Sequence, residues 1–171
     1  MQAKLKIAVV VVVLIIICTL CALFLFNGPP PPKDFVMNRT FETHENLLFV
    51  YEMTRYPSDV EVTNPEEDIL LGVTVDPWNL GFGIIPKGSY ERRFLNLVNL
   101  EENNVKVGIN PYGDIAPMIS FNKNNFILRA NESITVDVIL RTTNTTVTGN
   151  YTGEIDIIIV KPKYDFLYHI L

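Results

Sequence analysis

An uninterrupted apolar run near the N-terminus restricts this chain more than any other feature of its sequence. From Ile7 to Phe26 there is no charged residue, and Thr19 carries the only hydroxyl group in the run. About 20 helical residues extend about 30 Å, which matches the hydrocarbon core of a bilayer. Because unpaired backbone groups are costly in lipid, a crossing segment of this kind must be helical. The run therefore predicts a transmembrane helix over residues 7–26.

The flanks of this run favour an uncleaved signal-anchor over a cleaved signal peptide. A signal peptide has a shorter apolar stretch and a cleavage site of small residues, whereas this run ends in the bulky segment Leu23–Phe26. Lys4 and Lys6 precede the run. The positive-inside rule then predicts a cytoplasmic segment over residues 1–6, with all later residues outside the cell. Cleavage of the segment is the alternative.

Consecutive prolines at Pro29–Pro32 follow the apolar run. Proline fixes φ, and a proline run favours an extended polyproline II rod of about 3.1 Å per residue. We therefore interpret residues 27–34 as a spacer that lifts an extracellular domain, residues 35–171, off the membrane. A partner that recognises proline-rich segments is the alternative for this motif.

Charge and cysteine content exclude several classes of function. Lys4 and Lys6 are two of the 14 basic residues, so the rest of the chain carries 12 against all 19 acidic ones, a net charge of −7. Such a domain repels nucleic acid, and we expect no nucleic-acid partner. Both cysteines, Cys18 and Cys21, lie in the apolar run. The outer domain therefore has neither a disulfide framework nor a thiolate metal site.

Alternation of apolar and polar residues recurs through the outer region and predicts β-strands. The clearest case is Ile134–Arg141, in which every second residue is aliphatic. Residues 73–76, 105–110 and 151–159 alternate in the same way, and turn-forming Asn, Gly and Pro residues separate the runs. Several short strands at this spacing predict an all-β fold, an antiparallel β-sandwich.

The polar positions of these strands predict how the sheets pack. Glu154 and Asp156 lie on the face opposite Ile155 and Ile157, and such alternation is typical of a sheet with one face in the core and one in water. We therefore expect sheets packed on one side only. Residues 35–72 are expected to add one to three strands and a loop near Pro65.

Glycine and aromatic positions in two stretches resemble a known family. Residues 79–88 read Asn-Leu-Gly-Phe-Gly-Ile-Ile-Pro-Lys-Gly, and residues 149–157 read Gly-Asn-Tyr-Thr-Gly-Glu-Ile-Asp-Ile. These stretches resemble the opening and closing strands of immunoglobulin-like domains of the Hydin and major-sperm-protein type. The resemblance covers residues 73–161 and implies an immunoglobulin-like sandwich with an adhesive, scaffolding or accessory role. It carries over no catalytic residue.

Sequons of the form Asn-x-Ser/Thr mark the glycosylation candidates. The acceptor residues are Asn38, Asn131, Asn144 and Asn150. All of them lie in the region predicted to be extracellular, and most lie at predicted turns or strand ends. They agree with an extracellular glycoprotein, and chance occurrence in a chain rich in Asn and Thr is the alternative.

No recognisable catalytic, cofactor-binding or metal-binding motif occurs, so we expect a protein that is not an enzyme, with no cofactor and no small-molecule substrate. His44 and His169 lack the spacing of metal ligands, and we expect surface or packing roles for both. Trp78, the only tryptophan, is expected in the core or as a plug where strands cross. The aromatic tail Tyr164–Leu171 is expected to pack back onto the domain, and an exposed docking patch is the alternative.

These features together predict a membrane-anchored binding or structural module of the cell envelope that contacts other surface proteins, such as a surface layer. The alternative within the same class is a stator or accessory component of an archaeal surface filament, a source that the composition would suit. An extracytoplasmic enzyme or solute-binding protein is the least favoured class, because the sequence offers neither a lipid-attachment cysteine nor a polar constellation.

Overall fold

The computed structural model describes residues 11–17, 19, 28–65 and 79–169, which are mostly β-strand. The strands are β1 (Thr40–Glu45), β2 (Phe49–Thr63), β3 (Ile84–Pro86), β4 (Tyr90–Val98), β5 (Val105–Gly113), β6 (Ile119–Phe121), β7 (Phe126–Leu128), β8 (Ser133–Arg141) and β9 (Gly149–Pro162). Two short 3₁₀ helices, η1 (Ala116–Met118) and η2 (Asp165–His169), accompany them. The predicted all-β class is confirmed.

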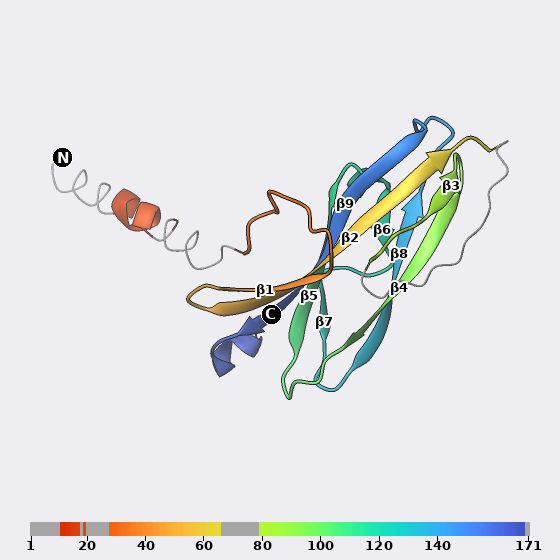
Figure 1. The fold of residues 1–171 in the computed structure, drawn as a ribbon. Coiled ribbons are helices and arrows are strands. Elements are labelled where there is room, and N and C mark those ends of the chain that lie inside the picture. The colour runs from red at the N-terminus through yellow and green to blue at the C-terminus, as the bar shows by residue number, and fades with distance from the viewer. Residues whose placement is uncertain (1–10, 18, 20–27, 66–78, 170–171) are drawn as a thin grey trace.

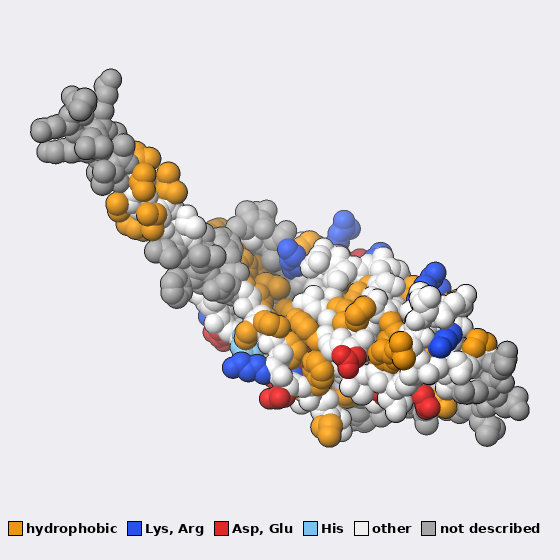
Figure 2. All heavy atoms as spheres, turned by 90° about the horizontal axis from the view of Figure 1, so that it is seen from above, with side chains coloured by type: hydrophobic (Ala, Val, Ile, Leu, Met, Phe, Trp, Pro, Cys, Tyr) orange, Lys and Arg blue, Asp and Glu red, His pale blue; other side chains and the backbone are white. Residues whose placement is uncertain are grey.

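The predicted membrane span over residues 7–26 lies mostly outside the described residues. Residues 11–17 are helical, and the hydroxyl group of Thr19 donates a hydrogen bond of 2.8 Å to the carbonyl oxygen of Ile15. Figure 2 shows the hydrophobic side chains of residues 11–17 gathered around this helix. Within the described part of the chain, no helix is long and apolar enough to cross a membrane.

The strands form two sheets. The large sheet has the order β1–β2–β9–β5–β7, with β3 added parallel to β2, and the small sheet has the order β4–β8–β6. All other pairings are antiparallel. Figure 1 shows that the hairpin of β1 and β2 extends beyond the small sheet, toward the N-terminal helix.

The hydrophobic core lies between the two sheets. Val136, Val138 and Leu140 of β8 are fully buried and belong to one cluster with Ile109 of β5 and Ile155 of β9. The predicted alternation is confirmed in β5 and β8, because every second residue points into this cluster. Burial of the aliphatic face is the main favourable contribution to the folding of such a domain.

Strand β2 buries opposite faces in its two halves. The buried apolar residues of the first half are Phe49, Tyr51 and Met53, whereas those of the second half are Val60 and Val62. Successive side chains of a strand alternate between the faces of the sheet, so the odd-numbered and even-numbered sets lie on opposite faces. The second set belongs to the core between the sheets. The first set lies on the other face of the large sheet, which we call the outer face.

Residues 28–38, hereafter the N-terminal segment, cover part of this outer face. A β-carbon at Gly28 would lie 3.8 Å from Cε1 of Tyr51, which is in contact distance. Residues 30–33 line a pocket together with side chains of β1, β2 and β9. The proline-rich stretch that we interpreted as a spacer therefore contacts the sheet over these residues.

The same outer face corrects the prediction of sheets packed on one side only. Glu154 and Asp156 point to this face, yet only 0% and 1% of their surface is exposed. The prediction is wrong for this part of the large sheet, because the N-terminal segment covers the second face there. Strand periodicity cannot reveal this covering, since the covering segment has no regular periodicity of its own.

A close approach of β5 and β9 explains one glycine of the resembling stretch. Gly153 of β9 lies opposite Gly113 of β5. A β-carbon at Gly153 would overlap the carbonyl oxygen of Tyr112 and lie 2.8 Å from Cγ2 of Ile115. Gly113 has a positive φ of 86°, which favours glycine. The backbones of β5 and β9 therefore approach each other here more closely than a residue with a β-carbon permits.

The remaining sequence predictions have mixed outcomes. Two of the strands expected in residues 35–72 are present as β1 and β2. The strand expected at residues 73–76, the rest of the loop after Pro65 and the side chain of Trp78 lie outside the described residues. Strand β6 has no counterpart among the predicted strands.

The aromatic tail packs back in part. Leu167 of η2 is buried, and the backbone N–H group of Lys163 donates a 2.8 Å hydrogen bond to the carbonyl oxygen of Leu48. Tyr164 and Phe166 remain exposed and stack on each other with ring centroids 5.9 Å apart. Leu167 thus follows the packing prediction, whereas the aromatic pair follows the alternative of an exposed patch.

Candidate functional site

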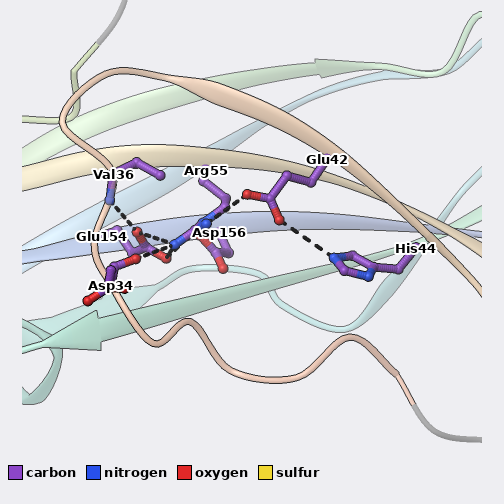
Figure 3. Close-up of polar contacts among 7 residues, drawn as sticks. All are labelled: Asp34, Val36, Glu42, His44, Arg55, Glu154 and Asp156. Carbon is purple, nitrogen blue, oxygen red and sulfur yellow. Dashed lines mark hydrogen bonds and ion pairs between the residues drawn. The ribbon is translucent and has the colours of Figure 1, made fainter.

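A cluster of charged residues lies on the outer face of the large sheet. Arg55, near the middle of β2, lies directly opposite Asp156 of β9 in the strand register. Glu154 lies two residues before Asp156, and its side chain therefore points to the same face. Glu42 reaches the cluster from the edge strand β1. Figure 3 shows these four side chains converging beneath the N-terminal segment.

Arg55 is the centre of this cluster. Its Nη2 donates hydrogen bonds of 2.8 and 3.0 Å to the two carboxylate oxygens of Glu154, and its Nε donates one of 3.1 Å to Oε1. Its Nη1 donates a 2.7 Å hydrogen bond to Oε1 of Glu42. Charge-assisted contacts of an arginine with two carboxylates are among the strong hydrogen bonds of proteins. Arg55 thereby joins β1, β2 and β9.

The backbone of the N-terminal segment is part of the same network. The N–H group of Val36 donates a 3.0 Å hydrogen bond to Oε2 of Glu154. Nη2 of Arg55 donates a 2.8 Å hydrogen bond to the carbonyl oxygen of Asp34. We call this arrangement the clamp: the side chains of Glu42, Arg55 and Glu154 with the backbone of residues 34–36. It fixes the chain at this point, because Arg55 and Glu154, which bond to this backbone, are held by β2 and β9 of the large sheet.

Asp156 is the least satisfied member of the cluster. Its Oδ1 atom has no hydrogen-bond partner among the described residues, and Nε of Arg55 lies 3.9 Å away. Burial, and then the adjacent charge of Glu154, raise the pKa of Asp156 to about 7. Burial and the charge of Asp156 also raise the pKa of Tyr112, which lies nearby on β5. By contrast, the hydrogen bond from Arg55 lowers the pKa of Glu42.

A small pocket opens between the N-terminal segment and the sheet. Its volume is about 200 Å³, and it is lined by Pro30, Pro31, Pro32, Lys33, Glu42, His44, Met53, Arg55 and Asp156. Nε2 of His44 lies 3.5 Å from Oε2 of Glu42, and both side chains are partly exposed. His44 is thus a surface residue at the rim, as the sequence predicted. In the described part of the chain, no three His, Cys, Asp or Glu residues are placed to hold a metal ion.

The glycosylation candidates are not brought together at the clamp. All four acceptor residues are exposed: Asn38, Asn131, Asn144 and Asn150. Asn131 lies just before β8 and Asn144 lies just after it, so this strand separates them. Asn150 is at the start of β9, and Asn38 is at the end of the N-terminal segment. The structure thus gives four accessible acceptors, none of which belongs to the clamp.

Sequence reasoning missed the clamp. Strand alternation predicts that Glu154 and Asp156 lie on the solvent face, and Arg55 and Glu42 belong to no recognisable motif. One signal was present in the sequence: residues 155–160 form an almost continuous apolar run, which is typical of a strand buried on both faces. Acidic residues within such a strand need partners, and an arginine elsewhere in the chain is the obvious candidate.

The chain was compared with protein-family models, with curated proteins and with solved structures, and none of the three comparisons gave a match. The immunoglobulin-like resemblance of the sequence therefore stays a prediction.

Proposed function

We propose that this chain is a membrane-attached structural or binding module of the cell envelope. In this proposal residues 7–26 form an uncleaved signal-anchor, residues 1–6 are cytoplasmic, and the β domain lies outside the cell. The observation that carries the proposal is the clamp, which fixes the chain that leads from the apolar run onto the middle of the large sheet.

The clamp suits a module that holds a position. A flexible linker would let the domain rotate about its attachment point. Here the hydrogen bonds of Arg55 and Glu154 tie residues 34–36 to two long central strands. A pull on the domain therefore passes through these bonds into the β2–β9 pairing, instead of being absorbed by slack in a linker.

The polar cluster supports a structural role better than an enzymatic one. Its strongest groups, Arg55 and Glu154, are paired with each other and with backbone atoms. The pocket beside them, about 200 Å³, is smaller than the roughly 300–1,000 Å³ of typical ligand sites. No Ser or Cys side chain lines it. These features favour a non-enzymatic module over an extracytoplasmic enzyme or solute-binding protein.

We also propose that the domain is related to immunoglobulin-like sandwiches, and the strand order supports this. Such sandwiches carry strands B, E and D together in one sheet and C, F and G in the other. The orders β4–β8–β6 and β5–β9–β2 correspond to these sets. In this assignment β2 takes the place of the last strand although it precedes the others in the chain.

The proposed partner is another surface protein, such as a surface-layer lattice. The clamp equally supports the second candidate, a stator or accessory component of an archaeal surface filament, since a stator transmits force to its attachment point. The exposed acceptors Asn38, Asn131, Asn144 and Asn150 support the extracellular address, because glycosylation requires accessible sequons.

Cross-linking mass spectrometry on intact cells of the native source tests this function. We expect lysines on the extracellular side, such as the exposed Lys33 and Lys123, to link to a surface-layer or filament protein, and the identity of that protein separates the two candidates. Lys4 and Lys6 serve as the matched control and should link only to cytoplasmic proteins. Links from Lys123 to cytoplasmic proteins alone would contradict the proposed topology.

A further inference from the structure

We infer that one end of the β domain rests on the lipid interface of the membrane that holds residues 7–26. This end, hereafter the tip, comprises Leu47 in the β1–β2 turn and the stacked pair Tyr164 and Phe166 beside it. The inference rests on the proposed function, because it needs the apolar run to be inserted in a bilayer. It replaces the idea of a domain lifted off the membrane by a spacer.

The length of the connecting chain limits the distance between domain and membrane. The apolar run ends at Phe26, and Gly28 already lies beside Tyr51 of β2, where an added β-carbon would be 3.8 Å from Cε1 of the ring. Two residues span at most about 7 Å even when fully extended. The headgroup layer on each side of a bilayer is itself about 5–8 Å thick. The part of β2 around Tyr51 must therefore lie at the membrane surface.

The tip lies at the end of the domain that is nearer to the membrane. Tyr51 lies two residues after the start of β2 at Phe49, and Leu47 lies in the turn before that start. The backbone N–H group of Lys163 bonds to the carbonyl oxygen of Leu48, which places the start of the aromatic tail beside the same turn. Figure 1 shows the turn and η2 at the end of the domain that is nearer to the N-terminal helix.

The exposed chemistry of the tip suits the lipid interface. Leu47, Tyr164 and Phe166 are 64%, 47% and 67% exposed. Aromatic side chains are enriched where membranes meet water, since their rings combine apolar surface with a polarised or hydroxylated edge. An aliphatic turn flanked by two stacked rings can enter the boundary between headgroups and acyl chains, as interfacial apolar faces do.

Lysines offset part of the acidic charge around the tip, although the domain as a whole is acidic. Glu45, beside the turn, is paired with Lys163 at 2.6 Å. Lys161 is paired with Glu52 at 2.7 Å and with Glu101 at 2.8 Å. Two lysines thus offset part of the acidic charge near the tip, which also includes the exposed Asp165 between the two rings, so the repulsion from anionic headgroups is reduced there.

The opposite end of the domain offers a matched control. Val147 is 70% exposed in the β8–β9 connection, just before Gly149, which pairs with Val62 at the far end of β2. From Phe49 to Val62 the strand extends about 40 Å at 3.3 Å per residue. A probe at Val147 is therefore too far away to sense a bilayer that touches Leu47.

Site-specific labels on the full chain in phosphatidylcholine vesicles test the inference. Cys18 and Cys21, both in the apolar run, are replaced by alanine, and an environment-sensitive fluorophore is attached at Leu47→Cys or at Val147→Cys. Phe166→Cys is a second tip variant in case Leu47→Cys alters the fold. Lipids that carry a quenching spin label near the headgroup should remove about half of the fluorescence of a label at the tip. Interfacial side chains lie about 5–10 Å deep, which is close to such a quencher. The Val147 label should stay unquenched.

The outcomes separate the inference from the function on which it rests. If the chain does not float with the vesicles or is extracted at alkaline pH, residues 7–26 are not inserted and the proposed function fails. If the chain is inserted but the tip labels are quenched no more than the Val147 label, the function survives and this inference is wrong. If the fluorescence of a tip label changes with protein concentration but not with the lipid quencher, the tip contacts another copy of the chain. That result would also overturn this inference.

Discussion

The two halves of β2 are stabilised in different ways. The second half buries Val60 and Val62 against the small sheet, in an apolar core that strand periodicity describes well. The first half buries the opposite face, and there the covering layer is an irregular segment joined through Arg55 and Glu154. An apolar core tolerates many arrangements of similar volume, whereas a buried ion pair is stable only with its partners in place. The stability of the outer face thus depends on particular residues, whereas that of the core depends on the alternation of apolar and polar residues.

The largest expected effect follows from removing β2 itself. A fragment of residues 73–171 retains the stretch that resembles immunoglobulin-like domains but loses the strand between β1 and β9. It exposes one edge of β9 and removes Val60 and Val62 from the core, so we expect no cooperative thermal unfolding by circular dichroism. A fragment of residues 28–171 is the control and should unfold cooperatively. A folded 73–171 fragment would show that the two halves of β2 are both dispensable.

Breaking the clamp should be the next largest effect. Glu154→Ala leaves Arg55 buried without its main partner and also removes the acceptor of the Val36 N–H group. We expect a loss of about 3–5 kcal/mol in the free energy of unfolding, measured with denaturant. Arg55→Ala should cost a similar amount, and the double variant should cost much less than the sum.

A core substitution provides the contrast for the double-mutant cycle of Arg55 and Glu154. Leu140→Ala, in the core on the other side of the large sheet, should cost about 2–5 kcal/mol. Its effect should add to that of Glu154→Ala, because the two side chains share no partner. Strong coupling between Leu140 and Glu154, or additivity between Arg55 and Glu154, would remove the distinction between the two faces.

The pH dependence of stability should come from Asp156. Its pKa is raised to about 7 in the folded protein and is about 3.9 in an unfolded chain. The folded state therefore keeps a proton that the unfolded state releases, so the contribution of Asp156 to stability is highest below pH 4 and falls as the pH rises through 7. Between pH 5 and pH 8 we expect a loss on the order of 2 kcal/mol.

Asp156→Asn checks this assignment. The variant should show a flatter profile between pH 5 and pH 8 and a higher melting temperature than the native chain at pH 8. Glu42 acts in the opposite direction, since its pKa is lowered, but its contribution is lost only in acid below this window. An unchanged pH profile in Asp156→Asn would mean that Asp156 does not titrate there.

The smallest effects should come from the rim of the pocket. Lys33 and His44 line the pocket without bonding to the backbone of residues 34–36 in the described contacts. Lys33→Ala and His44→Ala should each change the free energy of unfolding by less than about 0.5 kcal/mol, as exposed surface substitutions usually do. A loss comparable to that of Glu154→Ala would extend the clamp to the rim.

The sequence predicts the core of this fold well because the relevant signal is local. Alternation in β5 and β8 identifies the buried positions, and the glycine at position 153 marks a close backbone approach that the structure explains. These features depend on residues two positions apart or on a single backbone position. The resemblance over residues 73–161 contains most of the strands but omits β1 and β2.

The clamp could not be predicted because its signal is not local. Arg55 and Glu154 are 99 residues apart, and nothing in the pattern of either strand indicates that they meet. The proline-rich stretch is typical of a rod or spacer, and its contact with the sheet depends on surfaces that only the folded domain presents. The acidic residues within an apolar strand were the one available signal. They indicate that a partner is needed but do not identify it.

Amide hydrogen exchange at Val36 tests the central claim most directly. The N–H group of Val36 bonds to a buried carboxylate and lies in a segment with no secondary structure. With the clamp in place, this amide should exchange slowly, close to the rate of core amides in β9, and Glu154→Ala should raise its rate while β8 amides stay protected. Exchange of Val36 at the rate of an unstructured chain, in a native protein whose β8 amides are protected, would show that the N-terminal segment is not held on the sheet.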